Sequence, residues 1–220
     1  MTEPDRIYNT RKGGFRKARG WKQSEMDKFM EPDELRRLLQ TCSDGVGQGR
    51  MHAQFAWSTI AIAGNLGLRC GETIGLRHDD FKHLRDNYLI VRTLKRRAHI
   101  EDRLYVGEGE KELLYEILEY HPGKLMDKLF RLGERSIRFI FAYYAKLAGL
   151  SHNLSFHALR HTAARMIMTA AKAVGDENPI RHVTARLRHA PGANQVMAMI
   201  YTTPSPAERI AVANHKGVIR

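Results

Sequence analysis

Cysteine is scarce in this sequence, since Cys42 and Cys70 are the two cysteines among 220 residues. Two cysteines are too few for a disulfide-rich scaffold or for a zinc site built from four cysteines. We therefore expect a reduced, cytosolic compartment, where free thiols are usual. The sequence also lacks internal repeats and low-complexity segments, and its hydrophobic content of 43% is enough for a packed core.

No apolar run is long enough to cross a membrane, which needs about 18 residues. The longest apolar stretch, Phe55–Leu68, is interrupted by Ser58, Thr59 and Asn65. The N-terminal residues carry charges where a secretory signal would have its apolar core. We therefore expect neither a membrane partner nor secretion.

Acidic residues are outnumbered, because 36 Lys and Arg face 24 Asp and Glu, a formal net charge of +12. This surplus favours a polyanionic partner, most often nucleic acid, although a solvated basic surface is the alternative. Residues 1–28 are basic and lack apolar periodicity, so we interpret them as a flexible arm that follows a phosphate backbone, or else as a tail without a role. The candidate DNA-binding residues of this arm are Arg11, Lys12, Arg16 and Lys17.

Helical periodicity begins near residue 32. Apolar residues at i, i+3, i+4 and i+7 between Leu35 and Cys42 predict one buried helical face, and Pro32 suits its first turn. The glycine-rich segment 43–49 predicts a loop, and residues 52–64 predict a central helix because they are apolar nearly all round.

Residues 88–106 instead predict a β-hairpin, because β-forming residues flank a cationic tip that includes Lys95, Arg96 and Arg97. The pattern then returns to helices, the second of which Gly149 closes. The predicted helices contain residues 113–118, 137–148, 157–173, 179–187 and 193–201. We expect a mainly α fold with a small antiparallel β-sheet.

Three segments carry unusual chemistry, at residues 67–72, 157–162 and 187–189. In the first, Arg69 ends an apolar stretch. Burying an arginine there costs free energy unless the arginine is paired or faces a ligand, and Glu72 is placed to pair with Arg69. In the second, His157 and His161 have the spacing of a zinc pair. Their intervening residues Ala-Leu-Arg lack the glutamate of the HExxH motif, so we expect no metal.

Together these segments resemble the tyrosine recombinase (integrase) family. Residues 67–72 match its G-L-R-x-G-E box and residues 157–162 match its H-x-L-R-H-T box. Residues 187–189 match two of three positions of its L-G-H element, with Arg188 in place of glycine, and Tyr201 follows after an interval about three residues longer than usual. The segment between the second box and His189 is also longer, as loops tolerate.

The resemblance implies phosphodiester chemistry without a metal or other cofactor. Arginine forks bind phosphate oxygens, so Arg69 and Arg160 form the expected clamp. The remaining expected roles are a hydrogen bond from His189, nucleophilic attack by Tyr201, proton acceptance by His157, proton donation by Lys95 (with Arg96 and Arg97 as rivals) and orientation of Arg69 by Glu72. Without the boxes, Tyr201 fits a core tyrosine and Arg69 a structural ion pair.

The resemblance also implies an organisation and partners. We expect an arm over 1–28, a catalytic domain over 29–203, and a tail over 204–220 that docks on a neighbouring protomer. The expected partner is double-stranded DNA, on which we expect a tetramer of this chain. The expected location is cytoplasmic and nucleoid-associated, in a prokaryotic or phage system. The chain resembles a minimal recombinase, such as a fimbrial-switch inverting enzyme, or a catalytic fragment. An accessory DNA-binding protein with a degenerate recombinase fold and a type IB topoisomerase-like enzyme are the alternatives.

Overall fold

The computed structural model describes residues 29–50, 52–95, 98–150, 154–188, 204 and 206–220. For residues 93–95 and 98–100 it describes the backbone alone. The predicted arm, the hairpin tip at 96–97 and the predicted helix over 193–201 lie outside these ranges. None of the helices within them is both long and apolar enough to cross a membrane.

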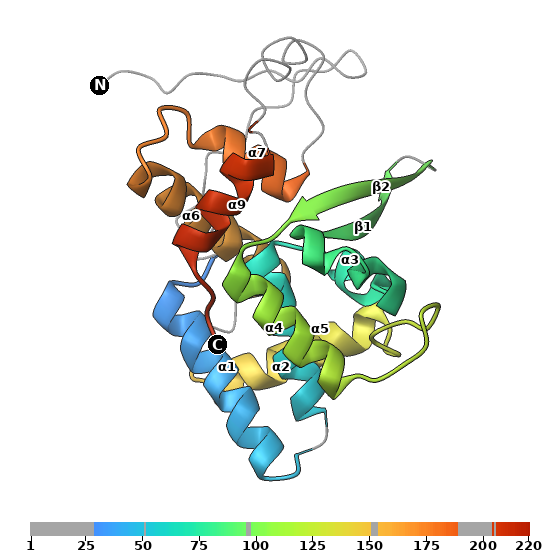
Figure 1. Cartoon of the computed structure of the whole chain (residues 1–220). Coiled ribbons are helices and arrows are strands. Elements are labelled where there is room, and N and C mark those ends of the chain that lie inside the picture. Colours follow the sequence, from blue (N-terminus) through green and yellow to red (C-terminus); the bar gives the residue numbers. More distant parts are fainter. Residues whose placement is uncertain (1–28, 51, 96–97, 151–153, 189–203, 205) are drawn as a thin grey trace, which may run out of the picture.

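The described chain is mostly helical with one two-stranded antiparallel sheet, which confirms the predicted fold class (Figure 1). Its elements are α1 (Pro32–Gly47), α2 (Ala53–Leu66), α3 (Cys70–Gly75), the 3₁₀ turns η2 (His78–Phe81) and η3 (Leu84–Asp86), β1 (Tyr88–Lys95), β2 (Ala98–Tyr105), α4 (Glu108–Tyr120), α5 (Glu134–Leu147), α6 (His157–Ala173), α7 (Ile180–Leu187) and α9 (Pro206–Lys216).

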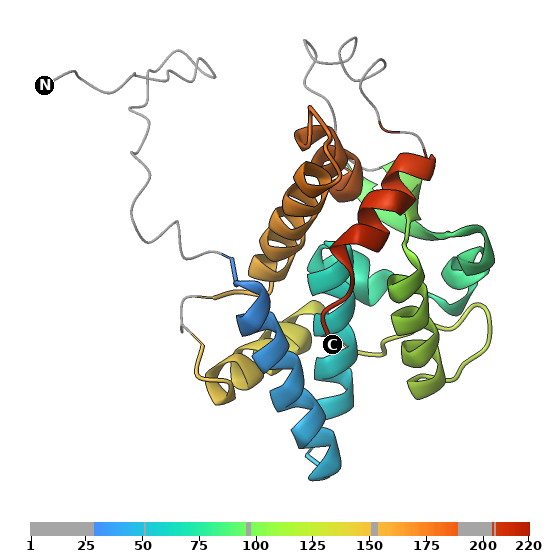
Figure 2. The same cartoon turned by 60° about the vertical axis from the view of Figure 1, so that its left-hand side comes forward.

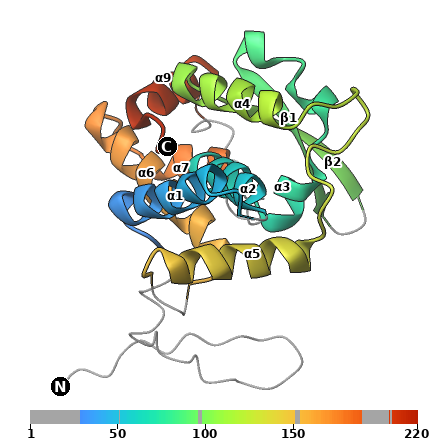
Figure 3. The same ribbon diagram turned by 90° about the horizontal axis from the view of Figure 1, so that it is seen from below.

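Helix α2 is the centre of the core, as its apolar sequence predicted. Every residue from Ala56 to Leu68 is buried, and α1, α4, α5 and α6 all contact the helix. Figure 3 shows this arrangement, with α2 surrounded by its neighbours. The polar Ser58 is accommodated there because its hydroxyl lies 2.9 Å from Nε2 of His121.

Helix α1 corrects one prediction. The expected loop over 43–49 is helical as far as Gly47. The reason is tertiary: Gly45 is buried against α5, where a Cβ would lie 3.1 Å from the Tyr144 hydroxyl and 3.2 Å from Cβ of Ala53. This glycine provides close packing inside the helix rather than a turn.

Strands β1 and β2 confirm the predicted hairpin. Their register runs from Tyr88 opposite Tyr105 to Lys95 opposite Ala98. Leu89 is fully buried on the body side of the sheet, where β1 contacts α3 and β2 contacts α9. The hairpin is thus anchored at its base and projects from the helical body (Figure 1).

The predicted helix over 157–173 has the same bounds as α6, and α7 begins directly after Pro179. Helix α5 ends at Leu147, and Gly149 follows with φ of 66° while its N–H donates to the carbonyl of Lys146 at 3.1 Å. A left-handed glycine there terminates the helix, as predicted.

The C-terminal segment packs on its own chain. Helix α9 contacts α6, α4 and β2, and Figure 2 shows it lying between α6 and α4. Lys216 Nζ lies 2.7 Å from Glu110 Oε1, and both side chains are buried. Asn65 both donates to and accepts from the backbone of Ile219 at 2.9 Å. Docking of residues 204–220 on a neighbouring protomer stays a prediction.

Candidate active site

Arg69 reaches the site because a glycine turn follows α2. Gly67 has φ of 72°, and a Cβ there would lie 2.8 Å from Cδ2 of Leu187, so both the conformation and the space favour glycine. Leu68 is buried next to it and fixes the turn. Arg69 then caps α3 with extended backbone, and 38% of its side chain is exposed.

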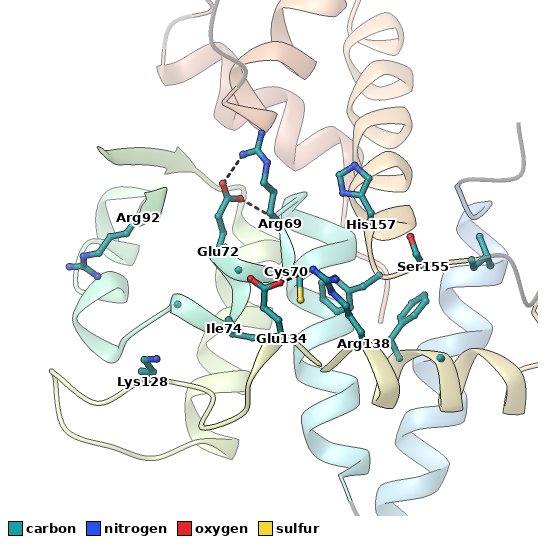
Figure 4. Close-up of a pocket in the computed structure, with 16 residues that line it drawn as sticks. Arg69, Cys70, Glu72, Ile74, Arg92, Lys128, Glu134, Arg138, Ser155 and His157 are labelled. Atoms are coloured by element: carbon teal, nitrogen blue, oxygen red, sulfur yellow. Dashed lines mark hydrogen bonds and ion pairs between the residues drawn. The ribbon is translucent and has the colours of Figure 1, made fainter. Parts of the chain in front are cut away.

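Glu72 holds Arg69 at two points. Its Oε2 accepts a hydrogen bond from the backbone N–H of Arg69, and its Oε1 accepts one from Nη1 of Arg69, both at 2.8 Å (Figure 4). The first bond is that of a capping box, in which a third-position glutamate reaches back to the helix start. The predicted pairing is therefore present, although its orienting role remains a prediction.

Arg160 is almost fully buried on α6. Nη1 donates to the carbonyl of Gly67 at 2.5 Å and Nη2 donates to the carbonyl of Leu187. These acceptors lie at the ends of α2 and α7, where the helix dipole favours a cation. Burial and the positive charge of Arg69 lower the pKa of Arg160 to about 10, so the guanidinium is still protonated at neutral pH.

His157 begins α6 and its side chain is exposed toward the cleft. Its ring centroid lies 4.6 Å from that of His161, with the rings nearly perpendicular. Partial desolvation, followed by the charges of His161, Arg160 and Arg69, lowers the pKa of His157. The neutral imidazole is thus favoured near pH 7, as a proton acceptor requires.

Arg188 also joins this cluster, although its sequence pattern predicted no role for it. Its Nη2 donates to Oε2 of Glu72 at 2.6 Å, and each of these side chains is 4% exposed. The carboxylate of Glu72 also lies 3.7 Å from Nη1 of Arg160. In the sequence, the feature that pointed to Arg188 was its place in the L-G-H element, where the family usually has glycine.

A cleft of about 950 Å³ opens beside these groups. Figure 4 shows Arg69 and Glu72 between His157 on one side and Arg92 and Lys128 on the other. Arg138 also lines the cleft and pairs with Glu134 at 2.7 Å. The cleft is open to solvent, and its lining carries four Lys or Arg residues against the two carboxylates of Glu72 and Glu134, a positive excess that suits an anionic ligand.

The structure thus brings together four predicted site residues, Arg69, Glu72, His157 and Arg160. Lys95 is described by its backbone alone, at the end of β1. The predicted His189 and Tyr201, and the DNA-binding candidates Arg11, Lys12, Arg16, Lys17, Arg96 and Arg97, lie outside the described residues.

Comparisons with known proteins define the class. The model of the phage integrase family matches residues 28–208, so this chain belongs to that family of tyrosine recombinases. A comparison with curated proteins gave no match.

Solved structures share the fold at low identity. The integrase from mycobacterium phage Brujita is 18% identical, with a TM-score of 0.65 over 93% of this chain and 62% of its own. The XerA recombinase is 22% identical, with a TM-score of 0.57 over 82% of this chain and 62% of its own. The lambda integrase catalytic core is 18% identical, with a TM-score of 0.53 over 73% of this chain and 94% of its own. This chain therefore covers less than two thirds of the first two structures and nearly all of a catalytic core.

Proposed function

We propose that this protein is a site-specific DNA recombinase that breaks and rejoins strands through a covalent phosphotyrosine. Membership of the phage integrase family supports recombination in general. The observation that carries the proposal is the convergence of Arg69, Arg160 and Arg188 on Glu72, beside a neutral His157 in an open basic cleft.

The charges in this cluster suit a phosphodiester. Three guanidinium groups face the single carboxylate of Glu72, so these four side chains carry a positive excess. A phosphodiester brings one negative charge, and its transition state gathers more on the non-bridging oxygens. Arg69 is the exposed member, so it is the guanidinium best placed to meet the phosphate from the cleft.

The proposed reaction balances without a metal. The Tyr201 oxygen forms a bond to phosphorus while its proton passes to His157, and the bond from phosphorus to the 5′ oxygen breaks. The departing 5′ oxygen takes a proton from Lys95. Rejoining runs in reverse, when the 5′ hydroxyl of a second strand attacks the 3′-phosphotyrosine and releases Tyr201.

Duplex DNA is the proposed partner, and a tetramer on DNA is the proposed assembly. Two structural relatives support the first point. One is a lambda integrase dimer bound to a core site, and the other is XerH recombinase bound to its difH substrate. Lys128 on the lining of the cleft provides a further contact for the phosphate backbone, whereas Arg92 and Arg138 there are paired with carboxylates of this chain.

A suicide-substrate assay tests the proposal. Duplexes taken from the DNA that flanks the gene, nicked beside the candidate cleavage position, should give a covalent protein–DNA adduct in a denaturing gel. Tyr201→Phe should abolish the adduct, because the nucleophilic oxygen is lost. Tyr143→Phe is the matched control and should leave the adduct intact, since Tyr143 is half exposed on α5.

Other outcomes would point to the alternatives. Specific binding of these duplexes without an adduct would replace the enzyme with an accessory DNA-binding protein. Relaxation of supercoiled plasmid without strand exchange between two sites would indicate topoisomerase activity.

A further inference from the structure

The backbone at Arg188 is unfavourable for an arginine. The residue follows α7 with φ of 52° and ψ of 43°, in the left-handed region that glycine adopts without steric cost. Its N–H donates to the carbonyl of Ala185 at 3.2 Å, which closes the helix. Glycine would make the same backbone bond with less strain, so the arginine side chain must contribute something that offsets the strain.

The side chain of Arg188 binds two acceptors at once. Nη2 donates to Oε2 of Glu72 at 2.6 Å and Nη1 donates to the carbonyl of Arg186 at 3.1 Å. The guanidinium is 4% exposed, so it does not face the cleft as Arg69 does. This geometry uses the fork of an arginine, which a lysine cannot reproduce.

The bond to Glu72 links two separate parts of the site. Glu72 lies on α3 and also accepts a hydrogen bond from Arg69, whereas Arg188 follows α7. The preceding carbonyl, that of Leu187, accepts a hydrogen bond from Arg160. The end of α7 is therefore attached to both arginine-bearing boxes, immediately before His189 in the sequence.

We propose that Arg188 is a positioning residue for the reaction, acting through Glu72. Its guanidinium fixes the carboxylate, which in turn fixes the direction of Arg69 and joins α3 to the end of α7. This inference rests on the proposed function and adds a residue to it.

The charged neighbours give the proposal a pH signature. Glu72 is faced by Arg69 at the start of its own helix, by Arg160 from α6 and by Arg188 from α7. Burial alone raises the pKa of Glu72, but Arg188 and the bonds from Arg69 outweigh it, so the net pKa is lowered. Loss of Arg188 should therefore raise the pKa of Glu72.

The charges around Arg188 itself come from further elements. Burial lowers the pKa of Arg188, Glu72 raises it, Arg186 on α7 lowers it and Asp102 on β2 raises it. All of these groups remain in a variant that lacks only the Arg188 side chain. A change in the titration of Glu72 can then be assigned to the missing guanidinium.

The test is single-turnover adduct formation on the nicked duplex by the full chain. Arg188→Gly should slow the adduct rate about 30-fold or more, while the Kd for the duplex stays within about twofold, because the cleft-facing cations remain. The Glu72 carboxylate should titrate at higher pH in this variant than in the wild type. Arg188→Lys should recover only part of the rate, since it supplies charge without the fork.

Two variants exclude a merely structural effect. His52→Gly relieves the same left-handed backbone at φ of 63° far from the site, and it should react like the wild type. Glu72→Gln combined with Arg188→Gly should be no slower than Glu72→Gln alone, because Arg188 acts through that carboxylate.

Separate outcomes decide the two proposals. If the wild type forms no adduct, the proposed reaction fails, and the titration of the Glu72 carboxylate by NMR in wild type and Arg188→Gly still decides whether Arg188 holds that carboxylate. A midpoint shifted to higher pH in the variant supports the positioning role. A wild-type adduct rate in Arg188→Gly, or an unchanged Glu72 midpoint, overturns it.

Discussion

Two buried glutamates make the same capping hydrogen bond at the start of a helix, but their surroundings differ. Glu72 and Glu110 each stand third in a helix, and each bonds back to the N–H before the helix, of Arg69 and of Gly107 respectively. Each also takes an arginine from the end of α7, Arg188 for Glu72 and Arg186 for Glu110. Helix α7 and the residue that follows it thus supply one cation to each cluster.

The difference lies in what surrounds each pair. Glu110 is fully buried, its second cation Lys216 is 1% exposed, and Arg186 also donates to the carbonyls of Tyr105 and Asn65. At Glu72 the second cation is Arg69, which is 38% exposed in the cleft. The closed cluster ties the C-terminal segment to α4 through Lys216, whereas the open one leaves a guanidinium exposed in the cleft.

The largest expected effect is a loss of stability when the closed cluster around Glu110 is broken. Glu110→Gln leaves Arg186 and Lys216 buried without their carboxylate, and removing one partner of a buried ion pair costs about 3–5 kcal/mol. We expect that loss in the free energy of unfolding, measured by urea denaturation. Glu112→Gln is the control, since that side chain is 73% exposed, and a similar loss in both variants would contradict the comparison.

The next effect concerns the open cluster. Arg69→Ala should lower the single-turnover adduct rate by about 10²–10³, the usual cost of one donor to a developing oxyanion. The free energy of unfolding should change by only about 1 kcal/mol, because Arg69 is partly exposed and Glu72 keeps its bond to Arg188.

Arg138→Ala is the matched control for Arg69→Ala. Arg138 lines the same cleft and pairs with Glu134 as Arg69 pairs with Glu72. An equal loss of rate in both variants would show that the cleft needs positive charge in general and not Arg69 in particular.

The smallest effect is a shift in the titration of His157. Because its pKa is lowered in the folded protein, its NMR midpoint should fall below the usual value of about 6.5. The unfolded chain takes up the proton first as pH falls, so this group reduces stability below that pH, and His157→Gln should remove that part of the loss. His161→Gln should raise the midpoint, since the charge of His161 helps to lower it. A wild-type midpoint at or above the ordinary value would count against a neutral proton acceptor.

Much of the fold and part of the site could be predicted from the sequence. Helical periodicity gave α6 with its observed bounds, and alternating β-formers gave the hairpin. The boxes identified Arg69, Glu72 and His157, which line one cleft, and Arg160, which is buried behind them 3.7 Å from Glu72. Other features escaped prediction, because a glycine such as Gly45 has the same local signature in a turn and in a close helix contact.

The sequence by itself determined the short-range features: the helices, the hairpin, and the capping contact between Glu72 and Arg69 three residues apart. These depend on neighbours along the chain, whose spacing is visible in the order of residues. Only the tertiary structure decided that Arg188 meets Glu72 across 116 positions and that Arg186 meets Glu110 across 76. Local propensity does not choose partners so far apart, because that choice depends on how α7 packs against the rest of the domain.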